Sequence, residues 1–417
     1  MNLLKKAYCR TFQTVFKIAL PFLPYRKPKI VSSVKDLPDI LEKRKCGRVL
    51  IVTDEGIKSL GLIKRLEKTL TNAELPFFIY DKTVANPTTV NVQEAVDIYL
   101  ENHCDCIIGF GGGSSMDCAK AVGACIAKPH QSLAQMKGIL KIHKKLPLLI
   151  AVPTTAGTGS ETTLAAVITD ANTRHKYAIN DFPLIPRYAV LDPKVTLSLP
   201  PSITASTGMD ALTHAVEAFI GRSTTLDTRR DALRAVRLIF QNIDKVYENG
   251  SDIRARKDML KASFYAGCAF TKSYVGYVHA IAHSLGGEYN VPHGYANAVI
   301  LPLLLEAYGP SIHKKLYRLA LEADLVEKDT PAEKAAEIFI QAVKDMKIRF
   351  GIGDTIDAIQ EEDIPKLAHY ADKEANPLYP VPVLMDAEEL ERFYYMLMPA
   401  SFSQTAKNSP AAAPKED

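Results

Sequence analysis

The chain has 417 residues, of which 47% are apolar and 24% charged, and its formal net charge is +4. Such a composition is typical of a soluble globular protein with two or three domains. The mild charge argues against nucleic-acid binding, and no apolar run reaches the ~18 residues that a membrane-spanning helix needs. The seven cysteines include no C-x-x-C pair, which indicates reduced thiols in a cytosolic protein.

Residues 1–29 form a basic amphipathic arm with seven Lys/Arg and no acidic residue. Its pattern predicts a helix with an apolar face and a polar face. The apolar face comprises Leu4, Tyr8, Phe12, Val15, Ala19 and Leu23, and the polar face comprises Lys6, Arg10, Gln13 and Lys17. Two alternatives stay open: residues 1–24 contact a membrane surface or a partner groove, or the helix docks on the protein's own body.

From residue 30 onward, short apolar runs alternate with helical periodicity. The runs predict strands over 49–53, 77–80, 106–110 and 148–152. The stretches between them predict helices over 57–70, 92–99 and 115–126. Because strands that alternate with helices form a parallel sheet covered on both faces, we expect an α/β domain with a Rossmann-like sheet over residues 30–199.

The pattern changes at Pro200-Pro201, beyond which long amphipathic stretches replace the apolar runs. We therefore expect an all-helical domain over residues 200–404. Residues 405–417 are rich in Ala, Pro and Ser and predict a disordered tail.

The third predicted strand runs into a glycine-rich turn, Gly109 to Asp117, and then into a helix. Glycines let the backbone approach a pyrophosphate, and the free amides at a helix N-terminus favour an anion. The turn follows the third strand rather than the first, which indicates a variant of the usual dinucleotide-binding domain. A tight turn that binds nothing is the alternative.

A second polar loop, Pro153 to Glu161, follows the fourth predicted strand and contains four hydroxyl side chains and two glycines. Hydroxyl groups can bind phosphate and ribose oxygens. The carboxyl ends of parallel strands meet at one edge of a sheet, where ligands bind. Two such loops after consecutive strands therefore indicate one nucleotide site rather than two solvated turns.

Several histidines of the predicted helical domain occur at helical spacing. Asp210 and His214 are four residues apart, His279 and His283 are four residues apart, and His293 follows a turn. Side chains at i and i+4 share one face of a helix. A carboxylate with two or three imidazoles suits a divalent transition metal such as iron(II) or zinc. Separate core histidines are the alternative, which two such pairs in one domain make less plausible.

These motifs resemble the iron-containing alcohol dehydrogenase family, in particular its branch of lactaldehyde reductases, propanediol dehydrogenases and butanol dehydrogenases. The resemblance spans residues 28–402 and rests on Gly111-Gly112-Gly113-Ser114 with Asp117, on the loop 153–161, and on the segments 210–218 and 279–302. It implies a dehydroquinate-synthase-like architecture, with a nucleotide-binding domain, a helical metal-binding domain and a cleft between them.

The resemblance implies site residues as well. The implied metal ligands are Asp210, His214, His279 and His293, and His283 is the implied non-ligand histidine, which can relay a proton. The implied cofactor is NAD, with contacts from Asp54, Asn86, Gly111, Gly112, Gly113, Ser114, Asp117, Thr154, Thr155, Thr158, Ser160, Lys176 and Leu191. The implied activity is hydride transfer between NAD(H) and a small alcohol, aldehyde or ketone. We expect a cytoplasmic homo-oligomer.

Asp54 also bears on cofactor choice. It follows the first predicted strand, at the sheet edge where the adenosine ribose should lie. A carboxylate at this place accepts a hydrogen bond from the ribose 2′-hydroxyl and repels a 2′-phosphate, so we expect NAD(H) to be preferred over NADP(H).

The chain departs from the family pattern at a few positions. Ser115 stands where proline is frequent, the basic arm is not a usual family feature, and Lys272, Tyr274 and Tyr295 are bulkier than usual and are expected near the substrate. Two alternative functions remain. A dehydroquinate-synthase-like lyase needs several Lys/Arg around its substrate, and the cleft motifs here are mostly apolar or hydroxylic. A non-catalytic homologue attached to a membrane or partner is the other, and the intact ligand set argues against it.

Overall fold

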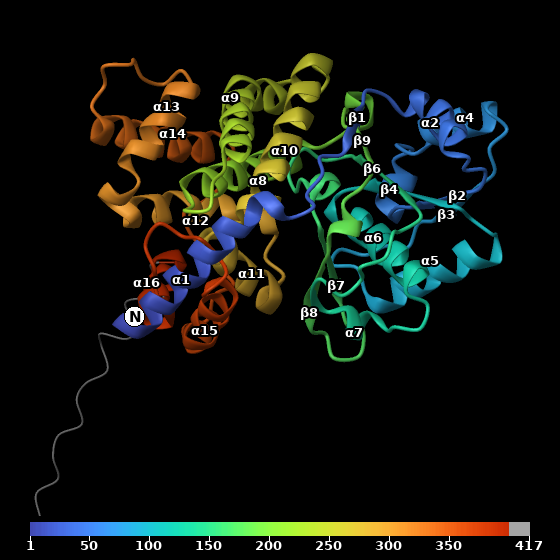
Figure 1. The fold of residues 1–417 in the computed structure, drawn as a ribbon. Helices are drawn as coiled ribbons and strands as arrows, with labels where there is room; N and C mark the ends of the chain where they lie inside the picture. The colour runs from blue at the N-terminus through green and yellow to red at the C-terminus, as the bar shows by residue number, and fades with distance from the viewer. Residues whose placement is uncertain (400–417) are drawn as a thin grey trace, which may run out of the picture.

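The computed structural model describes residues 1–399, which form an α/β half and a helical half side by side (Figure 1). The predicted tail, 405–417, lies outside the described residues. The main sheet is entirely parallel, with the strand order β1-β9-β6-β4-β2-β3. Its strands are β1 (Lys29–Val31), β2 (Val49–Val52), β3 (Phe77–Tyr80), β4 (Cys106–Gly111), β6 (Leu148–Pro153) and β9 (Tyr188–Val190).

The four predicted strands are confirmed as β2, β3, β4 and β6. Five further strands were not predicted from the sequence, because runs of two to five residues carry little periodicity. Two of them, β1 and β9, pair with each other at one side of the main sheet. The other three form a small second sheet, namely β5 (Gly138–Ile139), β7 (Ala165–Thr169) and β8 (Lys176–Asn180).

Successive residues of the central strands face opposite layers, as the pleat requires. Leu50 and Val52 of β2 belong to a buried cluster with helices α5 (Thr89–Glu101) and α6 (Gly113–Ala127). Val49 and Ile51 belong to the opposite cluster, with α2 (Leu37–Arg44), α3 (Glu55–Ser59) and α4 (Lys64–Asn72). The sheet is therefore covered on both faces, as predicted, and a short helix α7 (Leu133–Met136) completes this half.

The single helix predicted over 57–70 is wrong. The chain forms α3 and α4 with a turn between them, in which Gly61 adopts φ +70°. That conformation suits glycine and does not continue a right-handed helix. Leu60, one of the periodic apolar residues, is 65% exposed as a consequence.

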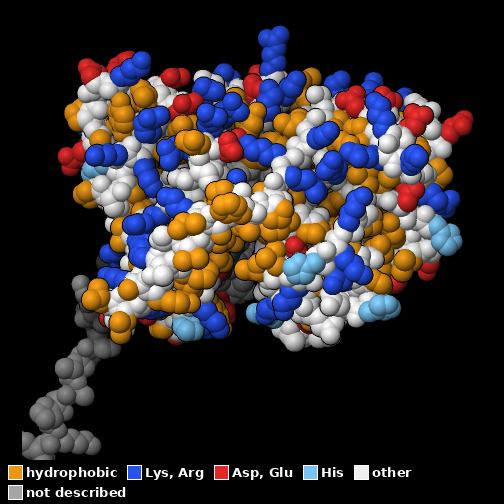
Figure 2. Space-filling model, in the orientation of Figure 1, with side chains coloured by type: hydrophobic (Ala, Val, Ile, Leu, Met, Phe, Trp, Pro, Cys, Tyr) orange, Lys and Arg blue, Asp and Glu red, His pale blue; other side chains and the backbone are white. Residues whose placement is uncertain are grey.

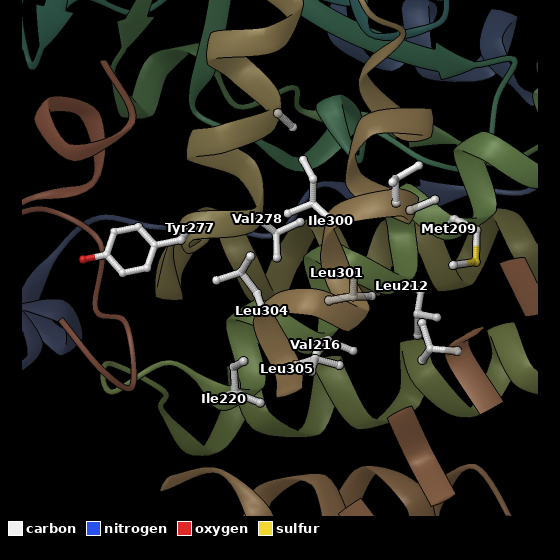
Figure 3. Close-up of a cluster of buried hydrophobic side chains, with 14 of the residues drawn as sticks. Met209, Leu212, Val216, Ile220, Tyr277, Val278, Ile300, Leu301, Leu304 and Leu305 are labelled. Atoms are coloured by element: carbon white, nitrogen blue, oxygen red, sulfur yellow. The ribbon is translucent and has the colours of Figure 1, made fainter. Parts of the chain in front are cut away.

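The described part of the helical half contains helices and no strand, as predicted. Helix α8 packs against α11 and α12 through the apolar side chains of Figure 3, among them Leu212 and Val216 of α8, Val278 of α11 and Leu301 of α12. The helices are α8 (Pro201–Ile220), α9 (Leu226–Glu248), α10 (Ile253–Ser273), α11 (Tyr277–Tyr289), α12 (His293–Tyr308), α13 (His313–Glu322), α14 (Ala332–Arg349), α15 (Ile364–Ala375) and α16 (Ala387–Leu397).

The basic arm forms helix α1 (Leu3–Ala19), followed by a short 3-10 turn at Leu20–Phe22. The helix lies on the helical half, close to α15 and α16 (Figure 1). Gln13 donates to the carbonyls of Pro377 and Tyr379, and Lys5 pairs with Asp372. The arm is thus docked on the protein's own body, although the helical face that it buries includes polar Gln13 and most of the predicted apolar face is exposed. Among the described residues, no helix is long and apolar enough to cross a membrane.

The two halves meet backbone to backbone at a pair of glycines. Gly159, in the loop after β6, adopts φ +62° and lies against Gly267 of α10. A Cβ atom on Gly267 would lie 3.0 Å from the Cα of Gly159 and closer still to the hydroxyl of Thr162. The absence of side chains at both positions therefore allows the loop to pack on the helix.

We expect Gly267→Ala to lower the free energy of unfolding by about 1–3 kcal/mol, because the added methyl group overpacks this contact. The measurement is urea denaturation of the purified protein. Gly287→Ala is the control, since a Cβ at this helical position meets nothing within 4 Å. The control should be as stable as the wild type or more so, and equal loss in both variants would contradict the packing argument.

Candidate metal centre and nucleotide-binding loops

Three predicted nucleotide-binding segments follow three neighbouring strands of the main sheet. Asp54 follows β2, the glycine turn follows β4, and the hydroxyl-rich loop follows β6, while the strand order places β4 between β2 and β6. The chain runs from β2 outward to β3 and then returns to the other side of β2 with β4. Asp54 and the glycine turn thus flank the topological switch point, where open α/β sheets bind ligands.

The glycine turn and the hydroxyl-rich loop face each other across this edge. A Cβ on Gly113 would lie 3.2 Å from the methyl group of Thr158, and one on Gly112 would lie 3.8 Å from the hydroxyl of Thr155. Gly111 adopts φ +156°, and a Cβ there would collide with Ser115. Helix α6 begins at Gly113, so its free amides open onto the groove between the two loops.

One hydroxyl in this groove has no protein partner. The Oγ1 atom of Thr155 is buried and makes no hydrogen bond among the described residues. Because a buried polar atom without a partner is costly, this orphan donor and the free helix amides suit the phosphate or ribose oxygens of a dinucleotide.

Asp54 is held in place by two hydrogen bonds. Its Oδ1 accepts from the backbone N of Ile57 at 2.9 Å, which makes it the N-cap of α3, and its Oδ2 accepts from the Ser115 hydroxyl at 3.0 Å. Ser115, where the family frequently has proline, therefore orients the carboxylate that we expect at the ribose. Each carboxylate oxygen keeps a further lone pair that can accept from a ribose hydroxyl.

Asn86, Ser114 and Lys176 come together although 90 residues separate the first and last of them. The Lys176 ammonium donates to Oδ1 of Asn86 at 2.7 Å, and the backbone N of Asn86 donates to the Ser114 hydroxyl. The three residues place a cation and an amide beside the start of α6.

Some predicted contact residues have internal partners. The Asp117 carboxylate accepts from the Ser160 hydroxyl at 2.7 Å and from the backbone N of Val167 at 3.1 Å. Buried Lys120, which the sequence reasoning did not select, donates to Ser160 at 2.9 Å. Leu191 is buried in a small apolar cluster against α10. These side chains hold the hydroxyl-rich loop against α6 and α10, while Thr154 is buried beside them.

The four predicted metal ligands converge in the helical half. Asp210 and His214 come from α8, His279 from α11, and His293 begins α12. The Asp210 Oδ1 atom lies 3.8 Å from Nδ1 of His214, 4.0 Å from Nε2 of His279 and 3.5 Å from Nε2 of His293. Bonds of about 2.1 Å to one metal ion bring its ligand atoms to separations close to these.

The chemical state of these ligands also suits a divalent cation. Burial lowers the pKa of His214 and of His279, so both imidazoles are neutral at neutral pH and keep a lone pair for a metal. The Nδ1 atom of His214 is buried and has no hydrogen-bond partner. A neutral nitrogen without a partner, aimed at a carboxylate and two further imidazoles, fits a metal ligand.

Two buried residues that the sequence reasoning missed hold this cluster. Glu217 of α8 accepts from Nδ1 of His279 at 2.6 Å and from the backbone N of Gly276 at 2.9 Å. The Asn297 amide donates to Asp210 at 2.8 Å and lies 3.1 Å from Nε2 of His293. Spacing was the available signal, because Glu217 follows His214 by three residues and Asn297 follows His293 by four.

His283 stands beside this cluster and has a different partner. Its ring stacks on that of His293 at 5.1 Å, and its Nδ1 lies 2.6 Å from a carboxylate oxygen of Glu374, which also accepts from the Tyr379 hydroxyl at 2.7 Å. Burial alone would raise the pKa of Glu374, but the net effect of His283 and Tyr379 lowers it. With Nδ1 engaged by a carboxylate, Nε2 of His283 remains free to exchange a proton.

Two of the three bulky residues that mark departures from the family pattern lie around the arm and the end of α10, and the third, Tyr295, lies in α12. Tyr274 adopts φ +63° and packs edge-on against Phe16 of α1. The Lys272 ammonium lies 5.9 Å from the ring of Tyr25. The Tyr295 hydroxyl donates to the carbonyl of Thr355 at 3.3 Å.

A parallel sheet with candidate phosphate-binding loops, joined to helices that gather one carboxylate and three imidazoles, indicates a nucleotide- and metal-dependent enzyme. Comparison with known families is more specific. Residues 30–193 match the model described as iron-containing alcohol dehydrogenase, and residues 204–398 match the C-terminal model of the Fe-containing alcohol dehydrogenase family. The chain belongs to the iron-containing alcohol dehydrogenase family, and it is therefore a metal-dependent oxidoreductase of alcohols and their carbonyl products.

Individual relatives agree with this assignment. The chain is 35% identical to 1,3-propanediol dehydrogenase of Citrobacter freundii over 377 residues, which cover 87% of this chain and 94% of the relative. It is 36% identical to the NAD-dependent methanol dehydrogenase of Bacillus methanolicus, with 82% and 90% covered. A crystal structure of 1,3-propanediol oxidoreductase superposes with a TM-score of 0.86 and 32% identity, covering 90% of this chain and 99% of that one. These matches favour the oxidoreductase over the lyase.

We expect Glu217→Gln to weaken metal binding by about 10- to 100-fold, because the variant loses the carboxylate that accepts from His279 and orients its ring. Equilibrium dialysis against ferrous or zinc ion, followed by elemental analysis, gives the affinity. The control is Glu288→Gln on the exposed side of α11, where the carboxylate pairs with Lys366. Unchanged affinity in Glu217→Gln would show that the pair has no role in binding metal.

Proposed function

We propose that this chain interconverts a small primary or secondary alcohol and its aldehyde or ketone, with NAD(H) as hydride carrier and iron(II) as the metal. The observation that carries the proposal is the convergence of Asp210, His214, His279 and His293 on one point in the helical half. Such a metal, when bound, supplies Lewis acidity at the substrate oxygen. The relatives named for NAD dependence and for propanediol support the cofactor and the size of the substrate.

The chain's own residues would then have separate roles. The glycine turn and the hydroxyl-rich loop bind the dinucleotide through Gly111–Ser114, Asp117, Thr154, Thr155, Thr158 and Ser160. Residues outside these two segments add contacts, namely Asp54, Asn86, Lys176 and Leu191. His283, whose Nδ1 is held by Glu374, moves the alcohol proton at its Nε2. Tyr274 and Tyr295 restrict the space for the substrate. Orientation of the nicotinamide toward the substrate carbon is the main contribution of the loops.

Further parts of the proposal concern organisation. We propose an arm over residues 1–29, a nucleotide-binding domain over 30–199, and a helical metal-binding domain over 200–404. We also propose that the protein acts in the cytoplasm as a homo-oligomer and that residues 1–24 contact a membrane surface. The free state of all seven cysteines is consistent with a reducing compartment.

The division of the histidines can be tested with two variants. We expect His279→Ala to lose bound metal and turnover together, since it removes a ligand. We expect His283→Ala to keep its metal while turnover falls by about 10²–10⁴-fold, the range for a general acid–base group. Elemental analysis and NADH oxidation with short aldehydes under anaerobic, iron-loaded conditions give both readouts. Loss of metal from His283→Ala, or full activity of a metal-free preparation, would contradict these roles.

Cofactor choice can be tested at Asp54. We expect wild-type kcat/KM to favour NADH over NADPH by on the order of 10²-fold, because the carboxylate repels a 2′-phosphate. Asp54→Asn should lower the ratio of kcat/KM for NADH to kcat/KM for NADPH, since asparagine keeps the N-cap of α3 and removes the charge. Glu55→Gln, one residue further on, is the control and should leave the ratio unchanged. Equal use of NADPH by the wild type would refute the role of Asp54.

A further inference from the structure

Helix α1 is docked in an unusual orientation, with its polar face inward. The inward side chains include Cys9 and Gln13, which are 1% and 4% exposed. The Arg10 guanidinium donates to the carbonyls of Val381 and Pro382 at 2.8 Å, and Lys5 binds Asp372 at 2.7 Å. These directional contacts fix the rotation of the helix about its axis, because a rotated helix would lose them together.

The outward face of α1 carries a row of exposed apolar side chains that continues into the 3-10 turn after it. These side chains are exposed by 38% at Phe12 of the helix and by up to 84% at Phe22 of the turn. The outward apolar side chains, which we call the apolar stripe, are Leu3, Leu4, Tyr8, Phe12, Val15, Ile18 and Phe22. Figure 2 shows hydrophobic side chains gathered along α1, with Lys and Arg side chains beside them. Contiguous exposed apolar surface of this kind is typical of an interaction site.

The charge of the arm indicates what covers the apolar stripe. Residues 1–29 carry seven Lys/Arg and no acidic residue. Lys5, Arg10 and Lys27 bind groups of the body, whereas Lys17 of α1 is exposed. Two copies of this arm packed stripe to stripe would bring like charges together, which disfavours self-association. An anionic lipid surface offers both an apolar layer for the stripe and negative headgroups for the lysines.

We infer that α1 lies flat on an anionic lipid bilayer, with the apolar stripe among the acyl chains and the rest of the protein held on the aqueous side. This inference rests on the proposed membrane contact and deepens it by naming the binding face and the lipid. The helix is already folded and oriented before it contacts the bilayer. Binding therefore does not require the loss of conformational entropy that folding of a disordered segment would require.

The test uses the full-length protein and vesicles of phosphatidylcholine with or without about one third phosphatidylglycerol. We expect co-flotation with the anionic vesicles, weaker binding to the neutral ones, and release as salt is raised. The variant Leu4→Ser/Val15→Ser/Ile18→Ser should bind at least about 100-fold more weakly, because it loses three apolar side chains that would enter the bilayer. It leaves the inward contacts of Gln13 and Arg10 in place.

A matched control removes the same number of exposed apolar side chains elsewhere. Leu60, Leu226 and Ile348 are 65%, 70% and 66% exposed and lie outside α1. The variant Leu60→Ser/Leu226→Ser/Ile348→Ser should bind vesicles like the wild type. Equal binding by the two triple variants would overturn the inference.

A fluorescent reporter checks the orientation of the helix. The chain has no tryptophan, so Tyr8→Trp places one indole in the apolar stripe. Its emission should shift to shorter wavelength with anionic vesicles, and an unshifted spectrum during co-flotation would overturn the proposed face. A different outcome would favour a second copy of the chain as the partner. The wild type would then form a dimer in sedimentation analysis and not bind vesicles, and the Leu4→Ser/Val15→Ser/Ile18→Ser variant would be a monomer. This result would overturn the inference. Alcohol oxidation is assayed in the same samples. Protein that is active but does not bind vesicles would overturn this inference and would not affect the proposed enzymatic function.

Discussion

The site depends on one constraint, which is that ionisable side chains must be buried among the apolar faces of α8, α11 and α12. The helices that pack through Leu212, Val278 and Leu301 also carry Asp210, His214 and His279. Burial keeps the imidazoles neutral, and neutral imidazoles are metal ligands. Glu217 and Asn297 contact this cluster, Glu217 through His279 and Asn297 through Asp210.

The candidate nucleotide-binding loops depend mainly on backbone packing, because glycines allow their close contacts. Glycines at 111–113 allow the glycine turn to approach the hydroxyl-rich loop closely, and Gly159 and Gly267 let that loop lie directly on α10. The same loop is tied to α6 through Ser160, Asp117 and Lys120. One loop thus contacts both α6 of the sheet half and α10 of the helical half.

The arm shows how polar contacts can decide which face of an amphipathic helix is buried. Burial of the apolar stripe against the body would have matched the usual pattern of surface helices. Gln13 and Arg10 instead find backbone carbonyls between Pro377 and Pro382 that need donors. Phe16 meanwhile packs on Tyr274 near the end of α10, so the arm is part of the helical half rather than an appendage.

The sequence by itself predicted four of the six strands of the main sheet, the all-helical second half and the candidate ligand histidines, because each is encoded by a pattern within a few residues. Tertiary structure alone decided the partners of those residues. Glu217 lies 62 residues from His279 in the chain, and Glu374 lies 91 from His283. A local sequence pattern cannot predict such pairings, since they arise only when α11 packs between α8 and α15. The amphipathic pattern of α1 likewise did not predict its orientation. The pattern shows that the helix has two faces, but it does not show which carbonyl acceptors of the body lie next to one of them.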